Sequence, residues 1–297
     1  MDNNNELQYL NLLRELVDVA SLNRLSDNRT DVKTYKAFGK TLEFDLTDNK
    51  IPLLTTKKVN YNLILHELIW MYVLKNPDTS YLEANNVKIW NEWSVPQGDS
   101  NTIGEMYGQI LRDFKYDASA DGETPNIDQV QRTIDILKAS PGSRRAIFTS
   151  FDPRAAADET RTFKENVDNG CGVLNPCHGL INQFVINYEG DLEFLTFQRS
   201  GDIFLGVPFN LAFYATLAHV VAQILGLKAV KMVYVLGDVH LYSNHLEQAK
   251  EQLSRSPYLS PTITIDPMLS SLDDLKFSSI TLNGYEHHAF IKAQVAV

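Results

Sequence analysis

The chain contains little cysteine, since only Cys171 and Cys177 occur among its 297 residues. Two cysteines are too few for a disulfide framework or a structural zinc site. The N-terminal stretch MDNNNELQYL is polar and acidic, which is not typical of a secretory signal. Together these features predict a protein of the reducing cytoplasm.

Positive charge and long apolar runs are also scarce. The formal net charge is −10 at pH 7, which argues against a broad nucleic-acid-binding surface, because such surfaces are basic. No stretch reaches the roughly 18 consecutive apolar residues of a membrane span. No internal repeat and no long linker rich in glycine, serine or proline divides the chain. We therefore expect a single domain over residues 1–297 that binds no membrane and no obligate nucleic acid.

Apolar residues recur every three or four positions in residues 7–20, which is typical of an amphipathic helix. Residues 62–74 and 208–226 are apolar nearly all round, so each predicts a buried helix. Helices are also expected over 127–137 and 244–255, and strands over 146–151, 180–188, 192–200 and 231–242, with a hairpin turn at 189–191. This mixture indicates an α+β (mixed α/β) fold with a variable polar excursion around 113–126.

Glu67 lies within the otherwise apolar stretch LILHELIWMYV. A carboxylate is costly to bury unless it is paired, and burial raises its pKa. Either Glu67 lies at a polar seam between helices, or burial tunes it as an acid or base.

Arginines recur at predicted loops and strand ends, namely Arg29, the pair Arg144 and Arg145, and Arg199 beside Ser200. A guanidinium group matches phosphate oxygens in a bidentate manner, and a serine hydroxyl can add a further donor. Each arginine taken alone fits an ordinary surface charge as well. The set predicts a phosphate clamp, provided that the fold brings the arginines together.

Cys177 begins an apolar run directly after a proline, in the stretch GVLNPCHGLINQFV. A lone cysteine is most often a small apolar core residue. In an extended run its neighbour His178 would point to the opposite face, so we do not expect His178 to act as a base on the thiol. A nucleophilic Cys177 would need a nearby cation to lower its pKa, and Arg199 is the candidate.

His240 and Tyr242 are two positions apart and share one face of a predicted strand, from which both could hydrogen-bond a polar ligand. His245 follows in the next predicted helix, and this spacing does not suit a metal site. We expect no metal.

Several motifs occur in order along the chain: NRTDVKTYKAFGKTLEFDL, PLLTTKKV, LHELIW, VKIWNEW, IGEMYGQ, SRRAIF, NPCHG, FQRSGDIFLGVPFNLAFYA, LGDVHLYSNHLEQ and the final VAV. This series closely resembles the folate-dependent thymidylate synthases that use an active-site cysteine. The likeness spans nearly the whole chain, and the block around FQRSGDIFLGVPFN is highly specific.

The resemblance implies a fold, an activity and an assembly. The fold would be a large mixed β-sheet covered by helices, with one sheet face at the interface of a homodimer. The reaction would convert dUMP and the cosubstrate 5,10-methylenetetrahydrofolate into dTMP and dihydrofolate, without a metal.

The resemblance also implies the catalytic residues. Cys177 would attack C6 of the uracil ring, which makes C5 a carbon nucleophile toward the one-carbon unit. Glu67 would serve proton transfers near O4 and C5 through water, and Tyr107 would assist proton removal at C5. Arg199 would belong to the same set, and Asn210 would bind the N3 and O4 edge of the base.

The implied nucleotide-binding set is Arg29, Arg144, Arg145, His178, Gln198, Arg199, Ser200, Asp202, Asn210, His240 and Tyr242. Within it the arginines and Ser200 would hold the phosphate, with Arg144 and Arg145 reaching across from the partner subunit. His240 and Tyr242 would bind the deoxyribose hydroxyl.

The implied folate pocket would be lined by Ile89, Trp90, Trp93, Leu174, Asp202, Leu205, Gly206 and Phe209. Asp202 would contact the pterin. Val297 would help to close the pocket over both ligands and exclude water.

The chain departs from the family pattern at several places. No glycine follows Arg29 in NRTDVKTY. Leu111 stands where many members have tryptophan, and Asn60 where many have a histidine near the folate. The segment 152–173 before the nucleophile is longer than usual, and it contains Cys171, for which the resemblance implies no role.

Three other functions remain open at this stage. A dUMP hydroxymethylase, or a dCMP hydroxymethylase, would share the fold and the cysteine attack but finish with water in place of hydride. Asn210 argues against the cytosine version, because an aspartate there would suit cytosine. A binding protein without turnover would have no chemical need for the catalytic set. A cysteine hydrolase built on Cys177 and His240 lacks an orienting acid and an oxyanion motif.

Overall fold

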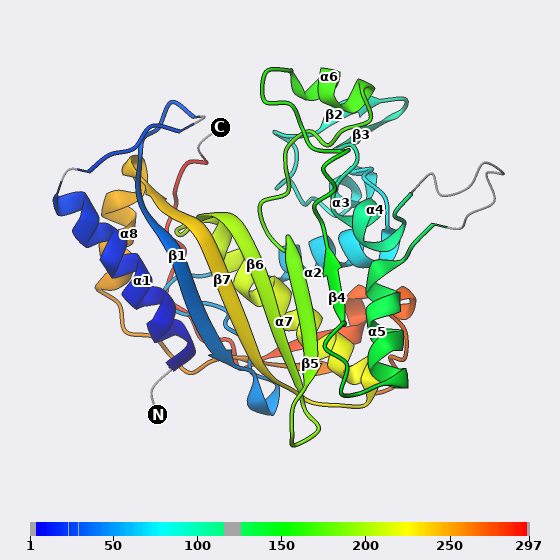
Figure 1. The fold of residues 1–297 in the computed structure, drawn as a ribbon. Helices are drawn as coiled ribbons and strands as arrows, with labels where there is room; N and C mark the ends of the chain where they lie inside the picture. Colours follow the sequence, from blue (N-terminus) through cyan, green and yellow to red (C-terminus); the bar gives the residue numbers. More distant parts are fainter. Residues whose placement is uncertain (1–3, 23, 29, 116–125, 296–297) are drawn as a thin grey trace.

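The computed structural model describes residues 4–22, 24–28, 30–115 and 126–295, in which helices pack against a five-stranded sheet (Figure 1). The strand order is β1-β7-β6-β5-β4. Strands β6 and β7 run parallel, whereas the other neighbours are antiparallel, so the sheet is mixed. The strands are β1 (Thr34–Asp45), β4 (Ile147–Thr149), β5 (Ile181–Ile186), β6 (Leu192–Asp202) and β7 (Ala229–Tyr242). The α+β prediction is confirmed.

Helix α7 (Gly206–Leu225) connects β6 to β7 and crosses behind the sheet in Figure 1. Two parallel neighbouring strands need a crossover of this kind. Among the described residues α7 is the one helix long and apolar enough to span a membrane, which the absence of a long apolar run did not lead us to expect. Because 83% of its apolar window is buried inside the protein, it is better explained as a core helix.

The other long helices also follow the predicted apolar periodicity. They are α1 (Asn4–Ser21), α2 (Tyr61–Ile69), α5 (Gln129–Ala139) and α8 (Leu246–Leu253). The helix predicted over 62–74 changes character after Ile69, because Trp70–Leu74 forms a π-helical turn, η2. Such turns are frequent at functional sites, and here the turn lies beside α4 (Gly108–Arg112).

Short elements complete the described chain. They are α3 (Ser80–Ala84), α6 (Phe163–Asp168), β2 (Val95–Gln97), β3 (Ser100–Thr102), β8 (Thr262–Ile265), β9 (Ile280–Asn283) and the 3-10 turns η1 (Thr47–Asn49), η3 (Ser243–His245), η4 (Leu272–Asp274) and η5 (Phe277–Ser279). The predicted hairpin joins β5 to β6 as expected. Most of the polar excursion predicted at 113–126 falls outside the described residues.

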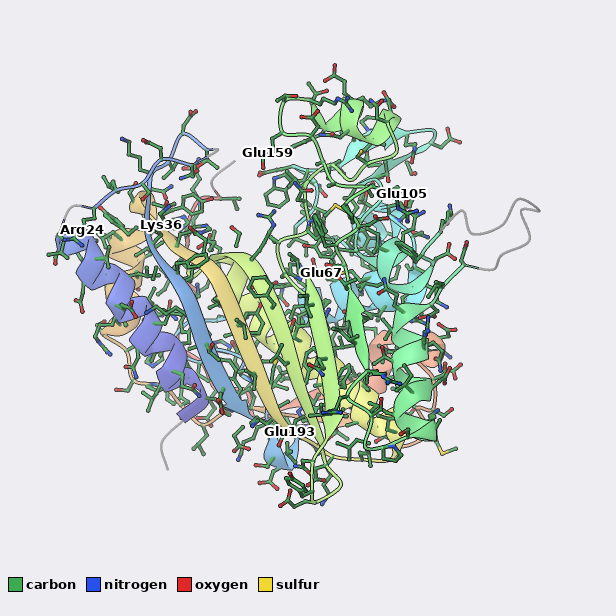
Figure 2. All side chains as sticks on the ribbon, viewed as in Figure 1. Arg24, Lys36, Glu67, Glu105, Glu159 and Glu193 are labelled. Atoms are coloured by element: carbon green, nitrogen blue, oxygen red, sulfur yellow. The ribbon has the colours of Figure 1, made fainter. Side chains whose placement is uncertain are left out.

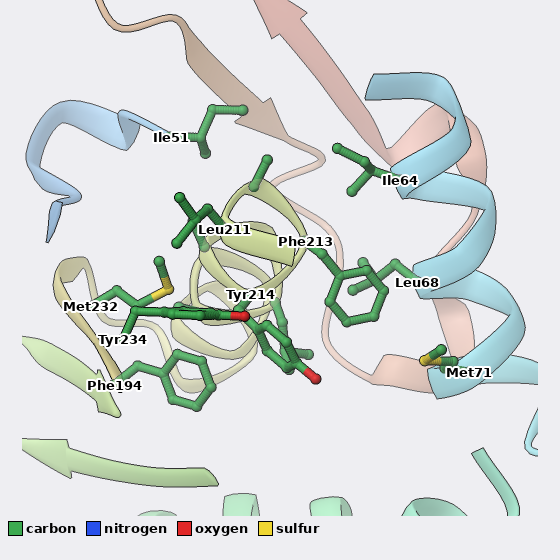
Figure 3. Close-up of a cluster of buried hydrophobic side chains, with 14 of the residues drawn as sticks. Ile51, Ile64, Leu68, Met71, Phe194, Leu211, Phe213, Tyr214, Met232 and Tyr234 are labelled. Carbon is green, nitrogen blue, oxygen red and sulfur yellow. The ribbon is translucent and has the colours of Figure 1, made fainter. Parts of the chain in front are cut away.

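The core lies between α7, α2 and the inner face of the sheet (Figure 3). Fully burying one such apolar side chain stabilises the fold by about 1.5–3 kcal/mol. The buried side chains labelled in Figure 3 are Ile51, Ile64, Leu68, Met71, Phe194, Leu211, Phe213, Tyr214, Met232 and Tyr234. This packing fixes the ends of β6 and β7, where the candidate site lies.

Candidate active site

A cavity of about 590 Å³ opens at the carboxyl ends of the parallel strands β6 and β7. Ligands of α/β proteins commonly bind at such strand ends. Eight of the predicted site residues line the cavity, namely Trp90, Tyr107, Leu174, Cys177, Arg199, Ser200, His240 and Tyr242. Residues from five separate parts of the sequence therefore meet at one place.

Cys177 lies in a loop before β5, so the prediction that it begins an extended run is wrong. Its backbone N–H donates to the hydroxyl of Tyr107 at 3.0 Å, and the thiol sulfur lies 3.7 Å from the same oxygen. Tyr107 adopts a positive φ of 44°, which is rare for a bulky residue. Backbone strain of this kind clusters at functional sites, and here it lies beside the thiol.

His178 is next to Cys177 in the chain, but its ring does not provide a positive charge for the thiol. Its ring stacks on Tyr107 with 4.7 Å between centroids, and its Nδ1 lies 2.7 Å from the hydroxyl of Tyr214. Gly179 allows this approach, since a Cβ there would lie 1.9 Å from the Tyr214 oxygen. Burial lowers the pKa of His178 to about 3, so the ring is neutral. This agrees with the expectation that His178 is no base for the thiol.

Burial raises the pKa of the Cys177 thiol above its usual value. The hydrogen bond from Tyr107 and the charge of Arg199 act in the opposite direction, whereas the nearby Glu67 carboxyl adds to the rise. Arg199 is thus the expected cation that lowers the thiol pKa, but the net pKa of the thiol is still raised. The reason is that desolvation of the thiolate outweighs both favourable contacts.

Arg199 lies against the loop that carries the thiol. Its Nε donates to the Pro176 carbonyl at 2.8 Å and its Nη2 to the Asn175 carbonyl at 2.7 Å. The Arg199 backbone N–H donates to the Cys177 carbonyl at 2.9 Å. Three hydrogen bonds therefore connect the end of β6 to the nucleophile loop.

Glu67 is buried in α2 with 4% of its surface exposed. The indole N–H of Trp90 donates to its Oε1 at 2.8 Å. Burial raises the pKa of this carboxyl from the usual 4.5 to about 7, although the indole hydrogen bond lowers it in part. The expected rise is confirmed, and the group can gain or lose a proton near neutral pH.

Asn210, in the first turns of α7, is held by a buried amide network. Its Nδ2 donates to Gln198 Oε1 at 3.2 Å, and the hydroxyl of Tyr234 donates to that same oxygen. Gln198 in turn donates to the carbonyl of Ser200 at 2.7 Å. The network fixes the orientation of the Asn210 amide.

His240 is oriented by a carboxylate that the sequence analysis did not single out. Its Nδ1 lies 3.0 Å from Asp238, and the Lys36 ammonium lies 3.9 Å from the other oxygen of that carboxylate. The His240 contact holds the pKa of Asp238 below its usual range, despite some burial. Strand alternation was an available signal, because Asp238, His240 and Tyr242 share one face of β7.

Two of the predicted folate residues line the cavity and the other described ones do not. Trp90 and Leu174 line the cavity, and the Trp93 ring meets the Trp90 ring edge-on at 6.1 Å. The Asp202 carboxylate accepts from the backbone N–H groups of Phe204 at 2.8 Å and Leu205 at 3.2 Å, just before α7 begins at Gly206. Ile89, Leu205 and Phe209 are half-buried and pack against the core.

The other described residues predicted to act on or bind the nucleotide do not line this cavity; they are Glu67, His178, Gln198, Asp202, Asn210, Arg144 and Arg145. Arg144 and Arg145 are exposed after α5, and Arg145 lines a separate hollow beside α5 and β4. Arg29 and Val297 fall outside the described residues.

The segment 152–173 lines the same cavity, a role that the sequence analysis did not assign. Its cavity-lining residues are Ala157, Asp158, Glu159, Arg161, Phe163, Asn166 and Val173. Figure 2 shows Glu159 across the opening from Lys36 of β1. In the part of the chain that the structure describes, no group of three or more His, Cys, Asp and Glu side chains gathers as a metal site.

Comparison with known proteins agrees with this arrangement. The family model described as thymidylate synthase matches residues 7–297. The chain belongs to the thymidylate synthase family. A thymidylate synthase of Francisella tularensis subsp. holarctica is 38% identical over 290 residues, which cover 98% of the chain and 99% of that relative. A thymidylate synthase of Francisella philomiragia is 37% identical with the same coverage. The family is one of methyltransferase-type enzymes, so the chain is identified as an enzyme of this type.

Proposed function

We propose that the chain converts dUMP and 5,10-methylenetetrahydrofolate into dTMP and dihydrofolate by covalent cysteine catalysis. The observation that carries the proposal is the meeting of the Cys177 thiol, the Tyr107 hydroxyl and the Arg199 guanidinium in one cavity. Trp90 lines this cavity, and its indole N–H donates a hydrogen bond to Glu67 behind it. Family membership makes the synthase the favoured activity.

Cys177 is the nucleophile of the proposal. Its sulfur forms a bond to C6 of the uracil ring, and the electrons of the C5–C6 double bond move toward C5 and O4. The thiolate is the reactive form, so a group that stabilises it promotes the attack. Arg199 is the cation whose charge favours that form.

Glu67 and Tyr107 handle the protons. With its pKa near 7, Glu67 is populated in both protonation states at neutral pH, which suits a group that must accept and return a proton. Because Trp90 separates it from the cavity, it acts through water near O4 and C5. The Tyr107 hydroxyl, beside the thiol, assists proton removal from C5.

Asn210 distinguishes uracil from cytosine. An amide can accept a hydrogen bond from N3–H and donate one to O4, which matches the uracil edge. One donor of this amide is occupied by Gln198, and this contact sets which way the amide faces. His240 and Tyr242 bind the deoxyribose hydroxyl, while Arg199 and Ser200 take the phosphate.

The other side of the cavity fits the cosubstrate. The Trp90 indole and the Leu174 side chain offer an apolar wall to a flat pterin ring, and Asp202 can accept from its N–H groups. When bound, methylenetetrahydrofolate supplies the one-carbon unit and the hydride. Trp90, Trp93 and Leu174 keep water from the reacting atoms, which favours the synthase over a hydroxymethylase.

The enzyme acts as a homodimer joined through the open sheet face. Figure 1 shows α7 behind the sheet and, among the described residues, no helix in front of β5 and β6. Along these strands, side chains that face the core alternate with side chains on the open face. The apolar side chains on the open face are Ile147, Ile181, Leu195, Phe197, Val233 and Val235. Ile147 and Ile181 are 52% and 45% exposed, which is typical of a surface that a partner covers. Arg144 and Arg145 then reach the phosphate of the partner's site.

The chain forms one synthase domain over residues 1–297, and it works in the cytoplasm. Its partners are a nucleotide, a folate and a second copy of itself.

The deciding experiment mixes the protein with dUMP and methylenetetrahydrofolate and follows dihydrofolate absorbance together with nucleotide mass. We expect dihydrofolate in step with a 5-methyl product. A 5-hydroxymethyl product with tetrahydrofolate left behind would mean a hydroxymethylase. Cys177→Ala should abolish turnover, since no other group replaces the thiol; near-normal turnover in that variant would contradict covalent cysteine catalysis.

A further inference from the structure

Two asparagine side chains clamp the backbone of residues 157 and 158. Asn175 Oδ1 accepts from the Ala157 N–H at 3.0 Å, and its Nδ2 donates to the Ala157 carbonyl at 3.3 Å. Asn166 pairs in the same way with Asp158, at 2.9 and 3.1 Å. Each amide thus satisfies both the donor and the acceptor of one residue, as a neighbouring strand would. Residues 157 and 158 are thereby held between α6 and the nucleophile loop.

The end of the segment 152–173 is bound to the loop before Tyr107. The Glu105 N–H donates to the Cys171 carbonyl at 3.3 Å, and the Val173 N–H donates to the Ile103 carbonyl at 2.9 Å. Gly104 has a φ of 70°, and a Cβ there would lie 2.2 Å from the Cys171 oxygen, so only glycine fits. The segment therefore contacts both loops that supply catalytic side chains.

Asn175 combines two of these connections in one residue. Its side chain holds the segment, while its backbone carbonyl accepts from Arg199 at 2.7 Å. It lies two residues before Cys177, in a loop that no strand pairing stabilises. The amide therefore replaces the ladder of hydrogen bonds that would otherwise fix such a loop.

We propose that Asn175 is a positioning residue for Cys177, which fastens the segment 152–173 to the nucleophile loop and so holds the thiol between Tyr107 and Arg199. This inference rests on the proposed function in taking Cys177 as the nucleophile. A displacement of about 1 Å can reduce a rate by on the order of 100-fold, so a clamp at this place has a measurable effect.

The test uses the full-length chain with Cys171→Ser, which leaves Cys177 as its only thiol. Asn175→Ala is compared with Lys164→Ala, a change at an exposed position of α6 in the same segment. Four quantities are measured: kcat, the KM for dUMP, the melting temperature, and the rate of Cys177 alkylation by iodoacetamide from pH 6 to 10.

For Asn175→Ala we expect kcat to fall about 10-fold, with the KM for dUMP changed less than about threefold. The alkylation profile should move to higher pH, because a loosened loop holds Arg199 less closely to the thiol. Lys164→Ala should match the parent in both readouts.

An unchanged alkylation profile and kcat in Asn175→Ala, or equal losses in Lys164→Ala, would overturn the inference. If Asn175→Ala does not fold, Asn175→Asp replaces it, since a carboxylate still accepts from the Ala157 N–H. Its kcat should fall below that of the parent by severalfold, and parental kcat with a parental alkylation profile would overturn the inference. If the parent forms no dihydrofolate, the proposed function fails, while the alkylation profiles still decide whether Asn175 positions the thiol.

Discussion

Glu67 couples the chemistry of the site to the stability of the protein. Its folded-state pKa of about 7 exceeds the usual 4.5, because the buried carboxylate is poorly solvated. The folded state therefore holds this proton more tightly than the unfolded chain. The contribution of this proton to the free energy of unfolding is fully present below about pH 4.5 and is lost as the pH rises through about 7.

Glu67→Gln should separate these two effects. The amide keeps an oxygen for the Trp90 N–H but carries no charge, so the variant should gain stability over the parent by on the order of 3 kcal/mol between pH 4.5 and 8. Its kcat should fall by about 100-fold or more, because the proton carrier is gone. Urea unfolding at several pH values and steady-state kinetics measure both. Glu189→Gln, in the exposed β5–β6 turn, should change neither; a parent-like pH dependence of stability in Glu67→Gln would show that another group titrates.

At the residue scale the sequence predicted which residues gather at the cavity better than it predicted the pKa values that their surroundings produce. Glu67 in an apolar helix predicted a raised carboxyl pKa, because its neighbours along the helix already supply the burial. The raised pKa of Cys177 was not predictable, since burial raises it while Tyr107 and Arg199 lower it in part, and the fold brings these groups from far apart. Local sequence carries no information on such a balance of desolvation and charge.

Among the elements, Arg112 at the end of α4 joins three neighbours. Its Nε donates to both oxygens of Asp128 at 2.9 Å, its Nη2 donates to Asp273 at 2.8 Å, and its Nη1 donates to the carbonyl of Tyr72. Only 1% of the Arg112 side chain is exposed. The guanidinium therefore links α4 to α5, to η2 and to η4.

Arg112→Met should destabilise the protein by about 3 kcal/mol, because it leaves the buried Tyr72 carbonyl unpaired and leaves Asp128 and Asp273 with only Lys75 as a cation among the described residues. The loss is measured as the change in urea unfolding midpoint and free energy. Lys164→Ala removes an exposed ion pair with Asp168 on α6 and should cost less than about 0.5 kcal/mol. Equal effects of the two substitutions would contradict a structural role of the Arg112 network.

Periodicity predicted the long helices and the β5–β6 hairpin, since the apolar faces of these elements repeat along the chain. The π-helical turn at Trp70–Leu74 was not predictable, because residues 62–74 are apolar nearly all round and the phase shift from one inserted residue leaves no visible break in that pattern. The clamp by Asn175 and Asn166 was also missed. Its partners are backbone groups of Ala157 and Asp158, and backbone groups leave no signal in a sequence.

For the whole molecule, shared active sites should allow two inactive variants to restore each other. In a homodimer where Arg145 serves the partner's site, Arg145→Ala removes a phosphate contact from the partner's site. Cys177→Ala removes the nucleophile from the subunit's own site. Random exchange of subunits gives mixed dimers with one intact site, so we expect about a quarter of parental activity. The measurement is dUMP turnover after brief mild denaturation and refolding of the mixed proteins. Activity no greater than the sum of the separate variants would exclude sharing through Arg145.

The order of the strands has a consequence for biosynthesis. β1, near the N-terminus, pairs with β7, and the apolar helix α7 is followed in the chain by that same strand. A nascent chain that has left the ribosome only as far as Leu225 carries α7 without β7, and its β1 has no partner. Pairing across such a long sequence separation is intrinsically slow. We therefore expect the apolar surface of α7 to stay exposed in newly made chains until β7 is available, and a product truncated before Ala229 to aggregate.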